Sequence, residues 1–189
     1  MLNKKLLFNS LYNIRLMDST NPETVSVKKS VHGKGIFTNT DLSKNDIILK
    51  ITGPALNFEQ TLDLGPDECY CLQVGIDKYI VPDYPFYLSN HSCDPNCGIN
   101  ENMELFALKP ISSGEELRWD YSTSMLERHW VMECKCCADS CRHKIKDFDL
   151  LPGELQDKYL HLGIVMPFIV ESLFGPPKIA KSERIKRII

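Results

Sequence analysis

The sequence has no excess of positive charge. It contains 22 Lys and Arg residues against 25 Asp and Glu residues, which gives a formal net charge of −3. DNA-binding domains owe much of their affinity to basic side chains that neutralise phosphates, so this balance predicts no direct sequence-specific binding of nucleic acid. The sum hides a basic tail, because residues 178–189 carry five basic side chains and one acidic side chain, a local charge of +4.

Long apolar runs are absent as well. No stretch approaches the roughly 20 apolar residues of a transmembrane helix, so we expect no membrane insertion. In the N-terminal flank, residues 1–24, the longest uninterrupted apolar run is 6–8, too short for the centre of a secretory signal. The apolar spacing there predicts an amphipathic helix instead. We therefore expect an intracellular, reducing compartment, with cytoplasm and nucleus, own or host, both left open.

Nothing in the length or composition calls for covalent cross-links. The chain has 189 residues, 43% of them hydrophobic, which is enough for one domain with a conventional core. In a reducing compartment, its eight Cys residues therefore indicate metal ligands, reactive thiols or buried small side chains rather than disulfides.

Three of the cysteines have the spacing of metal ligands. Cys134, Cys136 and Cys141 form the pattern Cys-x-Cys-x4-Cys, which places three soft ligands near one ion. Structural zinc takes four such ligands in a tetrahedron, so one more must come from elsewhere in the chain. The spacing leaves this fourth ligand open, and the candidates are Cys69, Cys71, Cys93, Cys97 and Cys137.

The order of apolar runs and turns predicts a mainly β fold. Between residues 25 and 121, short runs such as 47–51 and 105–108 are separated by Gly, Pro, Asn and Asp. Residues 124–133 fit a short helix. From residue 152 the apolar spacing becomes helical, with a second apolar stretch at 164–174. We expect a β domain followed by a short helical segment.

A polar segment and a glycine turn are the candidates for ligand binding. Residues 89–97 hold two amides, an imidazole, two hydroxyls and two thiols, with little apolar material to bury. This composition is typical of a loop whose polar groups bind a ligand. The turn Gly33-Lys34-Gly35 is weak evidence alone, since turns need glycine for their backbone conformation, and it lacks the strand and helix of a dinucleotide site.

Together these segments resemble the SET-domain protein-lysine methyltransferase family, including its post-SET zinc segment. The matching strings, in the family's order, are His-Gly-Lys-Gly-Ile-Phe at 32–37, Asn-His-Ser-Cys-Asp-Pro-Asn-Cys at 90–97, Gly-Glu-Glu-Leu-x-x-Asp-Tyr at 114–121 and the cysteine pattern at 134–141. The Asn-His-Ser-Cys string and the order of the set are specific, whereas a Gly-x-Gly alone is not.

The resemblance implies a fold and a division of the chain. The fold is mainly β, a SET-domain β-clip with a knot-like crossing, plus short helices and a helical C-terminal segment. The division is a flank at 1–24, a SET catalytic core at 25–123, a post-SET zinc-binding flap at 124–150, and a helical segment with the basic tail at 151–189. No cysteine-rich region precedes the core, so we expect a single zinc ion.

The resemblance also implies an activity. The chain is expected to transfer methyl groups from S-adenosyl-L-methionine, its co-substrate, to the side-chain amine of a lysine in a protein, with a histone as one candidate. One structural Zn²⁺ is the implied metal. The alternative is a non-catalytic, zinc-stabilised module for protein interaction. The sequence names neither the substrate protein nor the oligomeric state.

Carried over residue by residue, the resemblance implies Tyr121 as the catalytic residue. It implies Cys93 as the fourth zinc ligand beside Cys134, Cys136 and Cys141, with Cys97 as the alternative to Cys93. The residues that it implies around the cofactor are His32, Gly33, Lys34, Gly35, Tyr70, Asn90 and His91. It implies Tyr87 and Trp119 as walls of the substrate channel.

Two positions depart from the family's pattern. Tyr87-Leu88-Ser89 stands where the family often has Arg-Phe and a hydrophobic residue, so an arginine contact to the cofactor is missing. Trp119 stands where a Phe or Tyr tunes the number of methyl groups added. Because an indole has no phenol to hold the water that limits turnover to one methyl, we expect more than one methyl group to be added.

Overall fold

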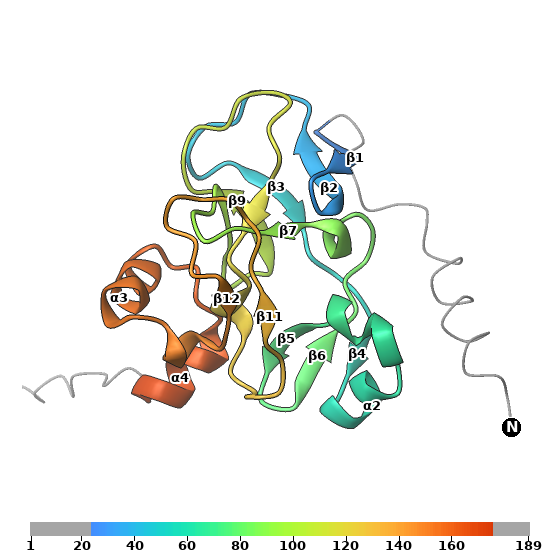
Figure 1. Cartoon of the computed structure of the whole chain (residues 1–189), viewed down its shortest axis with the longest axis vertical. Coiled ribbons are helices and arrows are strands. Elements are labelled where there is room, and N and C mark those ends of the chain that lie inside the picture. The colour runs from blue at the N-terminus through green and yellow to red at the C-terminus, as the bar shows by residue number, and fades with distance from the viewer. Residues whose placement is uncertain (1–23, 176–189) are drawn as a thin grey trace, which may run out of the picture.

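The computed structural model describes residues 24–175 of the chain (Figure 1). Of the N-terminal flank, only residue 24 falls in this range. The helix predicted in the flank and the basic tail at 178–189 lie outside the described residues. Within the described range, no helix has both the length and the apolar character needed to cross a bilayer.

The described residues form short strands in small sheets. The strands are β1 (Val25–Ser30), β2 (Gly33–Thr38), β3 (Ile47–Lys50), β4 (Ala55–Leu56), β5 (Leu72–Gly75), β6 (Lys78–Ile80), β7 (Asn90–His91), β8 (Cys97–Ile99), β9 (Glu104–Ala107), β10 (Arg118–Trp119), β11 (Met132–Glu133) and β12 (Lys144–Ile145). Pairs form between β1 and β2, β7 and β10, and β11 and β12, and two three-stranded sheets have the orders β3-β9-β8 and β4-β6-β5. The mainly β prediction is confirmed.

The helices are short. The α-helices are α2 (Phe58–Leu62), α3 (Gly153–His161) and α4 (Pro167–Phe174), and the 3₁₀ helices are η1 (Gly65–Tyr70), η2 (Phe86–Leu88), η3 (Tyr121–Ser124) and η4 (Phe148–Leu150). In Figure 1, α3 and α4 lie on one side of the molecule and α2 lies on another, beside β4. Both C-terminal helices fall in the segment whose apolar spacing predicts helix.

The main core surrounds the sheet β3-β9-β8. Strand β9 alternates in burial, with Leu105 and Ala107 fully buried and their neighbours half-buried, as expected for a strand with one face toward the core. Ile36, Ile99 and Leu117 add side chains that are at most 2% exposed. The central sheet thereby fixes the positions from which the polar loop at 89–97 and the segment 114–121 approach each other.

These two segments pair in parallel through β7 and β10. Asn90 lies opposite Arg118, and His91 lies opposite Trp119. The side chain of Asn96 extends the pairing, because its amide donates to the Glu116 carbonyl at 2.8 Å and its oxygen accepts from the Arg118 N–H at 2.8 Å. The pairing brings the chain that leads to Tyr121 against the polar loop.

The helix expected at 124–133 is absent. The chain leaves η3 at Ser124 and runs irregularly to β11. The backbone N–H of Leu126 donates to the Gln73 side chain at 2.8 Å, and that of Arg128 donates to the Asp147 carboxylate at 2.6 Å. Because side chains of other elements take these donors, the segment satisfies its backbone without a helix, which the apolar spacing could not reveal.

The C-terminal segment packs against the central sheet at a glycine. A Cβ added to Gly98 in β8 would lie 2.3 Å from Cγ2 of Ile164, a side chain that is 1% exposed, and 3.0 Å from its Cβ. Gly98 therefore allows the connection between α3 and α4 to approach the strand closely. The C-terminal helices share the core of the β domain.

Gly98→Ala should consequently destabilise the fold. Overpacking at a buried contact costs about 1–3 kcal/mol, and Ile164 has little room to move away. The free energy of unfolding, measured in urea, should fall by this amount. Gly153→Ala is the matched control, because a Cβ there meets nothing within 4 Å, and its stability should be unchanged or slightly higher. Equal stability of the two variants would contradict the close packing.

Candidate functional site

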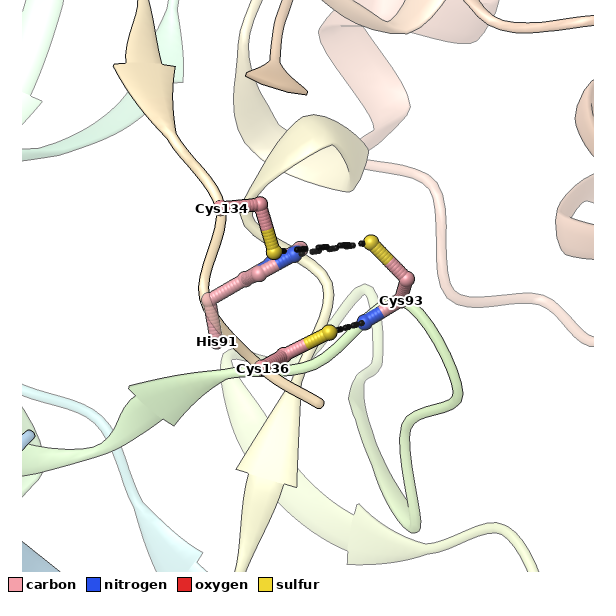
Figure 2. Close-up of side chains that lie close together, drawn as sticks. All are labelled: His91, Cys93, Cys134 and Cys136. Atoms are coloured by element: carbon pink, nitrogen blue, oxygen red, sulfur yellow. Dashed lines mark hydrogen bonds between the residues drawn. The ribbon is translucent and has the colours of Figure 1, made fainter. Parts of the chain in front are cut away.

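Four buried side chains converge between the polar loop and the flap. The ligand atoms of His91, Cys93, Cys134 and Cys136, called the thiol cluster below, all lie within 4.8 Å of one another. Figure 2 shows these side chains pointing toward a common centre. The sulfurs of Cys93 and Cys134 are 3.7 Å apart, and His91 Nε2 is 3.3 Å from the sulfur of Cys93.

Two local structures position the cluster. His91 ends β7, and Cys93 follows it in the polar loop. Cys134 and Cys136 follow β11, whose pairing with β12 is extended by the Cys134 N–H, which donates to the His143 carbonyl at 2.9 Å. The Cys93 N–H points at the sulfur of Cys136 at 3.5 Å. Segments more than 40 residues apart are thus joined through sulfur.

Cys141 lies at the edge of the thiol cluster. Its sulfur is outside the set of mutually close atoms, but its side chain contacts the thiols of Cys134 and Cys136. Cys141 is half-buried, and the His143 N–H points at its sulfur at 3.5 Å. Four ligand atoms thus lie mutually close and Cys141 is a fifth candidate at their edge, one more than a tetrahedral ion needs.

The surroundings of His91 bear on whether His91 or Cys141 completes a set of four metal ligands. The Tyr121 N–H points at Nδ1 of His91 at 3.3 Å, Oδ1 of Asp120 lies 3.6 Å from the same nitrogen, and burial lowers the pKa of His91 to about 4, which favours the neutral ring. Nε2 faces the sulfur of Cys93 at 3.3 Å. If Nδ1 accepts the Tyr121 N–H, the proton lies on Nε2, which then cannot coordinate a metal; Cys141 is the fourth ligand in that tautomer, and His91 donates to Cys93 from outside.

The environment of the sulfurs suits a bound cation. Burial opposes ionisation of Cys136, but N–H groups of Cys93 and Ala138 donate to its sulfur and lower its pKa to about 7. Burial raises the pKa of Cys93 to about 11 and that of Cys134 beyond its usual range. Three sulfurs whose positions converge with an imidazole on one centre are the donor set that a soft divalent ion prefers, and ion binding would favour the thiolate form of each cysteine.

The other candidate ligands lie elsewhere. Cys97 is fully buried in β8 within the main core, and Cys137 is exposed with its thiol directed at the Lys135 carbonyl. Cys69 lies in η1 and Cys71 is its C-cap, and both line a pocket described below. None of these four joins the thiol cluster.

Two pockets flank the polar loop. The first, here the turn pocket, lies between the turn after β1, the polar loop and the flap hairpin. It brings together six of the residues predicted around the cofactor, namely His32, Gly33, Lys34, Tyr70, Asn90 and His91. Gly35 is outside its lining. The second, here the aromatic pocket, is lined by Tyr87, Trp119 and Tyr121 together with Phe58, Tyr79 and Trp130.

The two pockets share a wall. Six residues line both of them, which are Cys69, Tyr70, Tyr87, Ser89, Tyr121 and Trp130. The two pockets are therefore adjacent, and Tyr121 borders both of them. Ser89 belongs to the polar segment 89–97 that the sequence indicates as a ligand-binding loop, whereas the position of Trp130 at this junction becomes visible only in the fold.

Asn90 is held in place by the turn and by the segment before β10. Its amide donates to the Lys34 carbonyl at 3.0 Å and to Oε1 of Glu116 at 2.7 Å. Gly35 explains how the turn approaches so closely, because a Cβ there would lie 2.2 Å from Oε1 of Glu116 and 3.0 Å from the Asn90 amide. Gly35 therefore acts through packing beside the turn pocket.

Ser89 anchors both aromatic side chains of β10 and η3. The Tyr121 hydroxyl donates to the Ser89 carbonyl at 2.7 Å, and Trp119 Nε1–H donates to the Ser89 hydroxyl at 2.7 Å. The two rings lie 4.9 Å apart. Burial raises the pKa of Tyr121 well above its usual range, so the phenol stays protonated at neutral pH. Tyr121 is a hydrogen-bonding group rather than a base.

A carboxylate also borders the aromatic pocket. Glu127 is half-buried there, and burial raises its pKa, with the Asp147 carboxylate adding to the effect. Sequence analysis missed Glu127, because it lies in the segment that was expected to be helical. With Glu68, which also lines it, the pocket combines an aromatic lining with two acidic groups.

Comparisons with known proteins identify the same region. Residues 33–122 match the SET domain family. The chain is 27% identical over 147 residues to histone-lysine N-methyltransferase 2B of Homo sapiens, covering 68% of this chain and 5% of that protein. It is 31% identical over 128 residues to histone-lysine N-methyltransferase ash1 of Drosophila melanogaster, covering 58% and 6%. The chain thus spans only about a twentieth of these relatives.

The thiol cluster predicts different effects for two adjacent cysteines. If the thiol cluster holds a metal ion, Cys136→Ser should lose most of it, because the substitution removes one of the mutually close sulfurs, whereas Cys137→Ser should keep it, because the Cys137 thiol is exposed and directed elsewhere. Elemental analysis of the purified full-length variants measures this. Metal loss in both variants, or in neither, would contradict the assignment.

Proposed function

We propose that this chain, which belongs to the SET-domain family, is a protein-lysine N-methyltransferase that uses S-adenosylmethionine. The observation that carries the proposal is the shared wall, because methyl transfer needs donor and acceptor in separate pockets that meet at one point. The names of the relatives support a histone as the substrate protein.

The turn pocket is the proposed cofactor site. When bound, S-adenosylmethionine supplies an electrophilic methyl group on a positively charged sulfur. His32, Gly33 and Lys34 offer the backbone and polar groups of a tight turn, and Asn90 presents an amide that is already oriented by two hydrogen bonds. Tyr70 lies on the shared wall and is proposed to pack against the cofactor. Such preorganisation reduces the entropy lost on binding.

The aromatic pocket is the proposed lysine channel. The attacking amine must be neutral, although the unperturbed pKa of lysine is about 10.4. Tyr87, Trp119 and Tyr121 surround it with apolar surface, which disfavours the ammonium form. No strong base is needed at Tyr121, whose buried phenol stays protonated. Its contribution is positioning, since holding the reacting atoms in line provides most of the rate.

A single structural Zn²⁺ is the proposed metal. Cys93, Cys134, Cys136 and Cys141 would hold it, and the Nε2–H of His91 and the backbone N–H of Arg142 would donate to the sulfur of Cys93 from outside. The ion supplies a cross-link between the polar loop and the flap, and it takes no part in methyl transfer. Because the flap hairpin lines the turn pocket, metal loss would also weaken cofactor binding.

Methyl transfer to mixed histones and to a cell lysate tests the proposed activity. The wild-type enzyme should transfer labelled methyl groups to a protein. Tyr121→Phe should lower the rate of methyl transfer about 100-fold, because the hydrogen bond from the phenol to the Ser89 carbonyl is lost and the wall shared by the two pockets shifts. Tyr84→Phe is the control, since Tyr84 is exposed and outside both pockets.

Asn90→Ala should weaken binding of S-adenosylmethionine, measured by calorimetry, whereas Asn102→Ala, outside both pockets, should not. Absence of binding by wild type would favour the non-catalytic module.

We further infer that the enzyme adds more than one methyl group. The only polar hydrogen of the Trp119 indole is committed to the Ser89 hydroxyl, so it cannot hold a water in the channel. Mass spectrometry of an unmodified lysine peptide should show di- or trimethyl product. Trp119→Tyr, which adds a phenol, should shift the product toward monomethyl, and Trp119→Phe should not. A wild type that stops at monomethyl lysine would refute this inference.

A further inference from the structure

A buried carboxylate stands behind the thiol cluster. Asp120 is 1% exposed, and it precedes Tyr121 in the chain without lining either pocket. A carboxylate buried in this way is costly unless charged and polar partners surround it. Its partners come from four parts of the chain, namely Arg142 in the flap, Tyr159 in α3, the backbone of Ser122 in η3, and His91 in β7, whose Nδ1 lies 3.6 Å from Oδ1 of Asp120.

Arg142 connects this carboxylate to the thiol cluster. Its guanidinium lies 2.8 Å from Oδ1 and 2.7 Å from Oδ2 of Asp120, a two-point contact that fixes its orientation. Arg142 directly follows Cys141, and its backbone N–H donates to the sulfur of Cys93 at 3.4 Å. Any displacement of the guanidinium is therefore transmitted to the chain that carries Cys141 and to the sulfur of Cys93.

Tyr159 connects the same carboxylate to the C-terminal helices. It is fully buried, and its hydroxyl donates to Oδ2 of Asp120 at 2.7 Å. Oδ2 is thereby shared between the phenol and the guanidinium of Arg142. Tyr159 lies 37 residues beyond the end of the region that matches the SET domain family, at residue 122, and it lines neither pocket.

We propose that Tyr159 is a positioning residue for the metal site. By fixing Oδ2 of Asp120 it orients Arg142, and Arg142 in turn holds the polar loop and the flap together around the ion. Without the phenol, the carboxylate is free to rotate and the two-point contact with the guanidinium loosens. The C-terminal helices thus control how firmly the metal is held, an inference that rests on the proposed metal site but not on methyl transfer.

Metal release from the full-length chain tests the proposal. The protein is loaded with Co²⁺, whose thiolate absorption reports tetrahedral sulfur ligation, and the loss of this absorption is followed after addition of a chelator. Tyr159→Phe should release Co²⁺ about tenfold faster than wild type, in line with the effect of removing partners of metal ligands. The substitution keeps the ring, so the core stays filled.

A matched control separates this effect from general destabilisation. Thr38→Val removes another fully buried hydroxyl, which donates to the Thr40 carbonyl at 2.7 Å in β2, outside both pockets and the thiol cluster. Both variants should melt at a lower temperature, but Thr38→Val should release Co²⁺ at the wild-type rate. Equal release from Tyr159→Phe and Thr38→Val, or a chain without thiolate absorption on Co²⁺ loading, would overturn the proposal.

A double substitution tests the route through Asp120. Asp120→Asn removes the charge that holds Arg142 and should itself accelerate release. If Tyr159 acts through this carboxylate, Tyr159→Phe should add little in the Asp120→Asn background, because coupled groups are not additive. A further tenfold acceleration in that background would show that Tyr159 acts by another path, and the proposal would fail.

Discussion

The parallel pairing of β7 with β10 is the constraint on which the site depends. It places Asn90 opposite Arg118 and His91 opposite Trp119, so residues 28 positions apart share one register. A shift by one residue would turn every side chain of the pair to the opposite face. The Asn96 side chain, bonded to the backbone of Glu116 and Arg118, prevents such a shift. The pockets, Tyr121 and the thiol cluster all follow from this register.

The flap has little core of its own. Only Met125 and Ile145 are buried hydrophobic side chains in the small cluster around Cys93, Cys134 and Cys136, whereas the main core holds more than twenty buried residues. A segment that buries so little apolar surface does not overcome its conformational entropy without another source of free energy. The proposed metal ion would supply it, and the contact of Arg142 with Asp120 fixes how the flap is oriented against the core.

Much of the architecture could be predicted from the sequence, for identifiable reasons. Short apolar runs separated by turn residues gave the mainly β fold, and the order of four motifs gave the family. The roles predicted for Asn90 and Tyr121 stay predictions, although the structure puts both beside the pockets. The false helix at 124–133 shows the limit, because backbone donors there bond distant side chains that local spacing does not encode.

The partners of buried polar groups were also beyond sequence reasoning. His91 was predicted beside the cofactor, and it lines the turn pocket, but only the geometry shows its Nε2 facing the sulfur of Cys93 at 3.3 Å. Tyr159 looks in the sequence like one more apolar position of a helix. The role of its hydroxyl becomes visible only in the fold, which brings it to Asp120, 39 residues away in the sequence.

The close packing at Gly35 couples the side chains at positions 35, 90 and 116. The Glu116 carboxylate that a Cβ at residue 35 would strike is the same group that orients the Asn90 amide. A larger residue at position 35 would push this carboxylate away and release the amide, unless a shorter acid at position 116 compensated. We therefore expect substitutions at positions 35, 90 and 116 to be coupled in their effects, because each changes the space or the hydrogen bond on which the other two depend.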